Sequence, residues 1–198
     1  LSRDEFARRL ARPASPPCAE DVHLFGLPQG APVTEAAVML PLVHRESRVH
    51  VLLTQRTAHL SDHAGQISFP GGRVEPEDPS REVTALRETE EEIGLPRDRI
   101  LVLGRLPLYE VPSGFRITPV VGWIEAPFTL QPDAFEVAEV FEVPVEHFLR
   151  PENYVRREYH FRGRHRHYMA VPYEGRYIWG ATAGMLYGFC RAMLAENG

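Results

Sequence analysis

Two runs of consecutive apolar residues in the first third of the chain predict a buried β-hairpin. The runs span residues 36–43 and 49–54 and are rich in valine and leucine. Short apolar runs bounded by polar residues are typical of strands in the interior of a sheet. The polar residues 44–48 would connect the two strands as an antiparallel pair.

A longer periodic segment, residues 78–93, predicts an amphipathic helix. Asp78 is a residue type that caps the first helical turn, and Pro79 is a type tolerated at the first helical position. We therefore expect the helix to begin there. Gly94 can adopt the left-handed conformation that ends helices, so we expect the helix to stop at this residue. The apolar positions that can pack against a sheet are Val83, Leu86 and Ile93.

Strand-like runs lie on both sides of this helix, with a short helix near the N-terminus and a long one at the C-terminus. This order predicts an α+β fold in one domain covering residues 1–198, since no linker or repeat divides the chain. The further strands are expected at residues 66–69, 100–106, 117–124 and 136–143, a second hairpin at 154–173, and the flanking helices at 4–10 and from 177 onward.

Composition narrows the class of protein. The chain has 198 residues, of which 43% are hydrophobic and 25% are charged, as in an ordinary globular domain. No apolar run is long enough to span a bilayer, and the first residues lack the apolar stretch of a secretory signal. The two cysteines, Cys18 and Cys190, are too few for a disulfide framework. We therefore expect a cytoplasmic protein without a membrane partner.

The charge distribution indicates a local site. A net charge of −5 argues against a nucleic-acid partner bound through a basic surface. The negative charge is concentrated, because residues 75–92 contain eight acids and only two arginines. Within this segment, Glu88, Glu91 and Glu92 are three or four residues apart and share one face of the predicted helix.

Three carboxylates on one strip repel one another unless a cation lies between them. Mg²⁺ prefers oxygen ligands and is usually held by one or two carboxylates with waters and substrate phosphates. The same pattern also occurs on solvated acidic faces, where Arg87 would pair with Glu91. The upstream segment favours the metal, because the strand-like residues 66–69 lead into Gly71 and Gly72. Adjacent glycines let the backbone approach a ligand closely.

Together these segments resemble the Nudix signature, Gly-x₅-Glu-x₇-Arg-Glu-U-x-Glu-Glu-x-Gly-U, in which U is aliphatic. The match runs from Gly72 to Leu95. Asp78 stands where the family has glutamate, one residue farther from the arginine, and Thr89 replaces an aliphatic residue. The resemblance implies the Nudix fold, a mixed β-sheet sandwiched between helices (α/β/α). It also implies hydrolysis of a diphosphate bond with Mg²⁺, or alternatively Mn²⁺, as the cofactor.

A second motif, at residues 52–72, resembles the signature of coenzyme A pyrophosphatases. That signature is Leu-Leu-Thr-x-Arg-[Ser/Ala]-x₃-Arg-x₃-Gly-x₃-Phe-Pro-Gly-Gly. Arg56 and Gly65 match it at the correct spacing, whereas Thr57 replaces serine or alanine and Ser61 replaces the second arginine. The resemblance implies a small-molecule substrate, coenzyme A or a derivative, cleaved to 3′,5′-ADP and 4′-phosphopantetheine.

The family resemblance also implies roles for individual residues. Glu88 and Glu92 would be the primary metal ligands, with Glu91 and the Gly72 carbonyl as further ligands. Arg87 would orient a carboxylate of the site, and we assign it with Glu91 to the catalytic group.

The catalytic base and the substrate contacts have weaker signatures. Glu136 and Glu139 lie in a later segment that could return to the site, and we take Glu139 as the candidate base. An ordinary polar role on a strand is the alternative for both. The residues available to bind the substrate are Arg56, His63, Gly71, Gly72 and Arg116.

Other interpretations stay open. The chain could be a Nudix hydrolase of another nucleotide, such as NADH or ADP-ribose, because Ser61 removes a cation from the coenzyme A signature. It could also be a Nudix-fold binding module without catalysis, although such modules would be expected to lack the carboxylates present here. An isomerase of the same fold acting on isoprenyl diphosphate is a remote alternative. The sequence indicates no oligomeric state.

Overall fold

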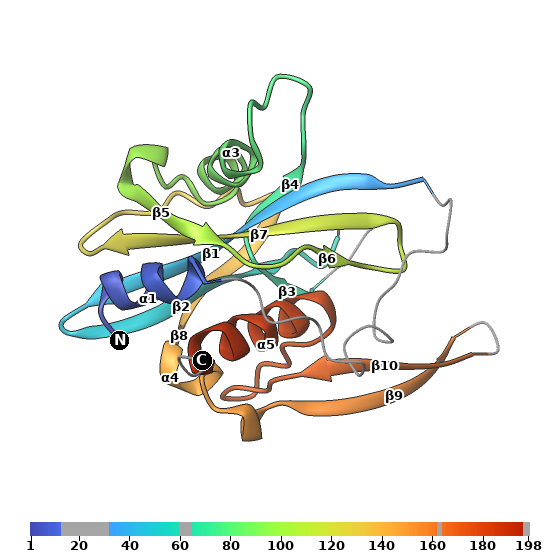
Figure 1. Ribbon diagram of the computed structural model, residues 1–198. Helices are drawn as coiled ribbons and strands as arrows, with labels where there is room; N and C mark the ends of the chain where they lie inside the picture. Colours follow the sequence, from blue (N-terminus) through green and yellow to red (C-terminus); the bar gives the residue numbers. More distant parts are fainter. Residues whose placement is uncertain (13–31, 60–64, 162–163, 196–198) are drawn as a thin grey trace.

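A computed structural model of the chain places a mixed β-sheet between two layers of helices (Figure 1). It describes residues 1–12, 32–59, 65–161 and 164–195. The helices are α1 (Arg3–Leu10), α3 (Arg81–Ile93), α4 (Val145–Phe148) and α5 (Gly180–Leu194), with 3₁₀ turns at Arg97–Arg99 and Pro151–Asn153. The strands are β1 (Thr34–Arg45), β2 (Arg48–Arg56), β3 (Ile67–Ser68), β4 (Gly71–Arg73), β5 (Ile100–Arg105), β6 (Tyr109–Glu110), β7 (Phe115–Glu125), β8 (Val137–Pro144), β9 (Val155–Phe161) and β10 (Arg164–Ala170).

The main sheet is organised around β1. In the described part of the chain its strand order is β3-β2-β1-β7-β5, with β8 paired to β2, β4 to β1 and β6 to β7. β1 runs antiparallel to β2, with Arg45 opposite Arg48, which confirms the predicted hairpin. β1 also runs parallel to β7 over the whole of β7, from Thr34 opposite Phe115 to His44 opposite Glu125. A mixed sheet results, as the α+β class requires.

Alternate side chains of β1 enter two separate cores. Met39 packs with Ile93 in a cluster between the sheet and α3. Leu40 points the other way, into a larger cluster with Phe6 of α1 and Phe189 of α5. The two phenylalanine rings stack with their centroids 6.0 Å apart, which joins α1 to α5. The sheet is therefore covered on both faces, and the expected α/β/α layering is confirmed.

Helix α3 begins two residues later than the sequence predicted. Ser80 is its N-cap, and the Ser80 hydroxyl accepts a hydrogen bond from the Val83 amide at 3.3 Å. The prediction that Asp78 caps the helix was wrong, because the Asp78 carboxylate is bound by the Arg87 guanidinium instead. The predicted end is confirmed, since Gly94 adopts the left-handed conformation with φ of 67°.

The C-terminal region also follows the predicted order. β9 and β10 form a separate two-stranded antiparallel sheet. Figure 1 shows this hairpin beside α5, on the side of the main sheet away from α3. Cys190 of α5 is a buried, free thiol, and Cys18 lies outside the described residues. Among the described helices, none has the length and apolar character needed to cross a bilayer.

Replacing Gly94 by alanine should destabilise the fold. A Cβ at this position would lie 2.7 Å from the Gln131 carbonyl oxygen, in addition to the unfavourable φ. We expect Gly94→Ala to lower the free energy of unfolding by about 2 kcal/mol in urea titrations. Gly188 of α5 is a matched control, because a Cβ there meets no atom within 4 Å. Gly188→Ala should raise the stability by about 0.5 kcal/mol, and an equal loss in both variants would contradict this account.

Candidate active site

The Arg87 guanidinium joins α3 to the loop that precedes it. Nε and Nη2 donate to the two carboxylate oxygens of Asp78 at 3.2 and 2.9 Å. Nη2 also donates to the carbonyl oxygen of Arg73 at 3.1 Å, at the end of β4. The pair is almost excluded from water, with 11% of the Arg87 side chain and 4% of the Asp78 side chain exposed. Residue 78 therefore anchors the loop to the helix.

The surroundings of Asp78 keep its carboxylate ionised. Hydrogen bonds from Arg87 hold the pKa of Asp78 well below its usual range, although burial acts in the opposite direction. The Glu75 amide and the Thr84 hydroxyl also donate to this carboxylate, at 3.0 and 2.9 Å. The same interaction raises the pKa of Arg87. The pair is thus a permanent charge pair over the whole physiological pH range.

Arg87 also contacts two of the predicted site carboxylates. Its Nη1 donates to Glu88 at 2.8 Å and to Glu91 at 3.1 Å. Glu88 is mostly buried, whereas 57% of the Glu91 side chain is exposed. The contact between Arg87 and Glu88 is the orienting contact that the family resemblance implies. The contact between Arg87 and Glu91 is the pair expected on a solvated acidic face. Both are present.

The Glu88 carboxylate lies against the backbone of Gly72. The residue lies in β4, opposite Ala37 of β1. A Cβ at residue 72 would overlap the Glu88 carboxylate, so glycine lets this acid lie directly against the strand backbone in the observed position. Gly71 is equally constrained, because its Cβ would overlap the backbone of β1 at Ala37 and Val38.

Glu92 is a buried carboxylate with an unfavourable environment. Only 7% of the residue is exposed. Burial raises the pKa of Glu92 to about 8, and the charges of Glu136 and Glu88 act in the same direction. The Arg56 guanidinium and the Gly71 amide oppose this shift. A divalent cation with a preference for oxygen would relieve the repulsion, so the chemistry of the donor set fits a metal of this class.

The carboxylates do not form a complete ligand cluster by themselves. Among the described residues, no group of three acids, histidines or cysteines has the geometry of a metal site. Glu88 and Glu91 instead share hydrogen bonds from the Arg87 guanidinium. In this arrangement, Glu88 and Glu92 are the buried acids of the strip, and Glu91 lies at its exposed edge.

The structure separates the two candidate bases. Glu139 forms two hydrogen bonds of 2.7 Å with Arg176, on the face of the sheet that packs against α5. Glu136 instead acts electrostatically on both Glu88 and Glu92. Glu139, the candidate preferred from the sequence, is therefore bound by Arg176, whereas the charge of Glu136 acts on the carboxylates of α3.

The remaining predicted substrate-binding residues, Arg56, Arg116 and His63, differ in their surroundings. Arg56 ends β2 close to Glu92, and its buried Nε has no hydrogen-bond partner among the described residues. Arg116 lies on the same face of the sheet as Arg56. Its guanidinium is paired with Glu110 at 2.9 Å and with Glu35 at 3.3 Å. His63 lies outside the described residues.

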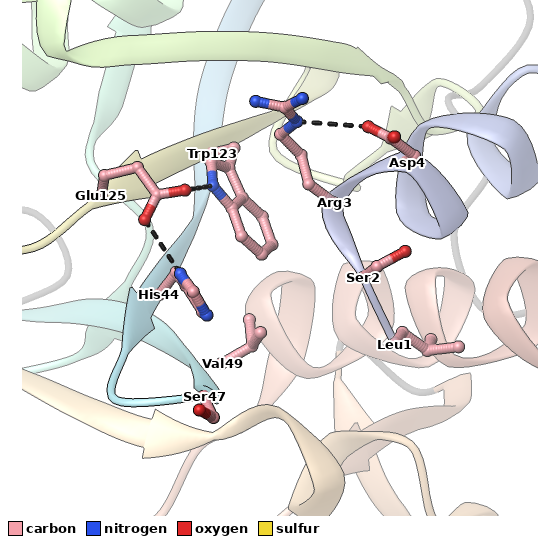
Figure 2. A pocket seen from close by; sticks show the side chains of 9 residues that line it. All are labelled: Leu1, Ser2, Arg3, Asp4, His44, Ser47, Val49, Trp123 and Glu125. Atoms are coloured by element: carbon pink, nitrogen blue, oxygen red, sulfur yellow. Dashed lines mark hydrogen bonds and ion pairs between the residues drawn. The ribbon is translucent and has the colours of Figure 1, made fainter.

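A shallow pocket of about 260 Å³ lies away from these carboxylates (Figure 2). It is formed by α1, the β1–β2 turn and the end of β7. Three of its polar side chains bind each other, since Glu125 accepts one hydrogen bond from the Trp123 indole at 2.7 Å and contacts His44 at 2.9 Å. Its lining residues are Leu1, Ser2, Arg3, Asp4, His44, Ser47, Val49, Trp123 and Glu125.

Comparison with known proteins identifies the family. A family model described as NUDIX domain matches residues 33–162, so the chain belongs to the Nudix family. An uncharacterized Nudix hydrolase, NudL, of Yersinia enterocolitica is 39% identical over 190 residues, covering 92% of this chain and 94% of the relative. NudL of Citrobacter koseri is 41% identical over 152 residues, covering 77% and 79%.

Among solved structures, the Nudix hydrolase RenU from M. smegmatis has a TM-score of 0.49 and 23% identity, covering 59% of this chain and 74% of its own. By its family, the chain is a hydrolase of the pyrophosphate bond in nucleoside diphosphate derivatives, and this family generally uses divalent metal ions. The membership favours the hydrolase over the non-catalytic module.

Removing the charge of Asp78 should destabilise the protein in a pH-dependent way. Because the pKa of Asp78 is lowered on folding, its contribution is present above the unfolded pKa of about 3.9 and is lost as the pH falls through the folded pKa. We expect Asp78→Asn to cost about 3 kcal/mol at pH 7 in urea unfolding. The deficit should shrink below pH about 4. Glu77→Gln removes an exposed neighbouring charge and should cost little; a pH-independent deficit for Asp78→Asn would argue against the pair.

Proposed function

We propose that this hydrolase cleaves the diphosphate bond of coenzyme A or its derivatives, giving 3′,5′-ADP and (acyl-)4′-phosphopantetheine. The position of Arg56 carries the proposal. This arginine belongs to the coenzyme A-type motif, and the fold brings it to the buried acid Glu92 of the Nudix helix. Its Nε is buried without a hydrogen-bond partner among the described residues, and we assign the guanidinium to a phosphate oxygen of the substrate. A cytoplasmic setting suits the free thiol of Cys190.

We assign the metal to the buried end of the carboxylate strip. Glu88 and Glu92 would hold Mg²⁺ or Mn²⁺, with Glu91 and the Gly72 carbonyl as further ligands. When bound, the ion neutralises the diphosphate oxygens and lowers the pKa of a bound water. Arg87 would keep Glu88 over the Gly72 backbone, in the orientation that the 2.8 Å contact shows.

We assign the role of base to Glu136. Its charge raises the pKa of Glu88 and Glu92, so its carboxylate shares their surroundings. Glu136 would accept a proton from the attacking water while the new P–O bond forms and the bridging P–O bond of the diphosphate breaks. Arg56 would hold the substrate phosphates during this step. Arg116 already has two carboxylate partners, so any contact with substrate would require one of these pairs to open.

Removing the charge of Glu92 should raise the stability of the metal-free protein and weaken its binding of Mg²⁺. In the metal-free protein, the carboxylate is buried and repelled by its neighbours, so Glu92→Gln should raise the free energy of unfolding by about 1 kcal/mol at pH 8. The wild type should gain thermal stability when Mg²⁺ is added, and the variant should gain little. Glu90→Gln is the matched control, because Glu90 pairs with Arg97 at 2.7 Å outside the strip. An equal response of Glu92→Gln and wild type to Mg²⁺ would exclude Glu92 as a ligand.

The substrate can be tested directly. Purified protein with Mg²⁺ or Mn²⁺ is given coenzyme A, NADH or ADP-ribose, and the products are resolved by chromatography. We expect 3′,5′-ADP to accumulate from coenzyme A, with a loss of at least about 100-fold in rate for Glu92→Gln and wild-type activity for Glu90→Gln. Faster turnover of NADH or ADP-ribose, without 3′,5′-ADP from coenzyme A, would assign the enzyme to another nucleotide.

A further inference from the structure

The loop that carries Glu136 is fixed at both of its ends. At one end, the Asp133 amide donates to the Glu92 carbonyl at 2.9 Å, which ties the loop to the C-terminal turn of α3. At the other end, Val137 begins β8 and pairs with Arg56 of β2. The loop therefore bridges the helix that carries the carboxylates and the strand that carries the arginine.

The loop is also closed internally. The Asp133 carbonyl accepts hydrogen bonds from the amides of Glu136 and Val137, at 3.0 and 2.8 Å. The Asp133 side chain accepts another from the Phe135 amide at 2.8 Å. These bonds restrict the backbone of residues 133–137, so the position of Glu136 depends on where the loop as a whole is held.

Thr57, the residue after β2, makes the contacts that hold the middle of this loop. Its hydroxyl donates to the Phe135 carbonyl at 2.7 Å. Its amide donates to the Glu136 carbonyl at 2.9 Å. The residue is 7% exposed, so the hydroxyl has little access to water. The register of β2 against β8 shifts between Gln55 and Arg56, directly before this contact. Such irregularities commonly re-aim residues beside active sites.

We propose that Thr57 is a positioning residue for hydrolysis, which fixes Glu136 against the carboxylates of α3 through its two hydrogen bonds to the loop. The inference rests on the proposed role of Glu136 as base. A base acts only within hydrogen-bond reach of the water, and small displacements of a reacting group reduce the rate strongly. The substrate-binding side chain of Arg56 would remain in place, so the loss should affect the chemical step and not substrate binding.

Steady-state kinetics of Thr57→Val and Thr57→Ser test this role. Valine keeps the shape of threonine but leaves the Phe135 carbonyl without its donor, whereas serine keeps the hydroxyl. We expect Thr57→Val to lower kcat about tenfold with KM nearly unchanged, and Thr57→Ser to recover most of kcat. If Thr57→Val does not fold, as judged by circular dichroism, Thr57→Ala replaces it with the same expectation.

Thr182 supplies a matched control. Its buried hydroxyl donates to the Ile67 carbonyl at 3.0 Å, at the start of α5 and away from the loop. Thr182→Val therefore loses the same kind of hydrogen bond and should retain kcat. If Thr57→Val loses no more kcat than Thr182→Val, or if KM rises while kcat is kept, the positioning role is wrong.

A double variant separates this inference from the proposed function. Thr57→Val in a Glu136→Gln background should cause no further loss of kcat, because the group it positions is already inactive. An additional tenfold loss in that background would overturn the inference. If Glu136→Gln alone keeps the wild-type rate, the proposed base is wrong and the inference falls with it. If Glu136→Gln loses rate but Thr57→Val does not, only the inference is overturned.

Discussion

The hydrogen bonds of the Arg87 guanidinium are the interaction on which the site depends. The planar group binds three separate segments: the Asp78 carboxylate in the loop, the Arg73 carbonyl at the end of β4, and the Glu88 carboxylate of its own helix. Its fixed fork of donors satisfies both oxygens of the nearly buried Asp78 carboxylate, which would otherwise be costly to remove from water. These bonds hold α3, β4 and the loop between them in one arrangement, with Glu88 directly over Gly72.

Glu92 shows that this arrangement does not maximise stability. A carboxylate with 7% exposure, whose pKa is raised to about 8, opposes folding whenever it is ionised. The Arg56 guanidinium and the Gly71 amide offset only part of this cost. Sites that retain such a local conflict are commonly functional, since the missing favourable charge comes from a ligand. In a Nudix hydrolase, a bound divalent ion would supply the positive charge that the Glu92 carboxylate lacks.

The parts of this molecule that follow local rules could be predicted from the sequence. The β1–β2 hairpin and the end of α3 at Gly94 depend on short-range pattern and backbone conformation. The start of α3 could not be predicted, because the Asp78 side chain has two competing uses, as a cap and as a partner for Arg87. Local propensity favours the cap, whereas the tertiary fold selects the ion pair. The choice between Glu136 and Glu139 could not be made from the sequence either, since it depends on tertiary contacts such as the pairing of Glu139 with Arg176.

Asp78 departs from the family signature in both side chain and spacing, and it still pairs with Arg87. Aspartate is one methylene shorter than the glutamate of the signature, which alone would withdraw the carboxylate from Arg87. The loop is one residue longer, and in this fold the carboxylate contacts the guanidinium at 2.9 and 3.2 Å. The shorter side chain is also held by Thr84 and by the Glu75 amide, which leaves little freedom in its position. The sequence motif thus differs in both side chain and spacing, while the charge pair that organises the site is present.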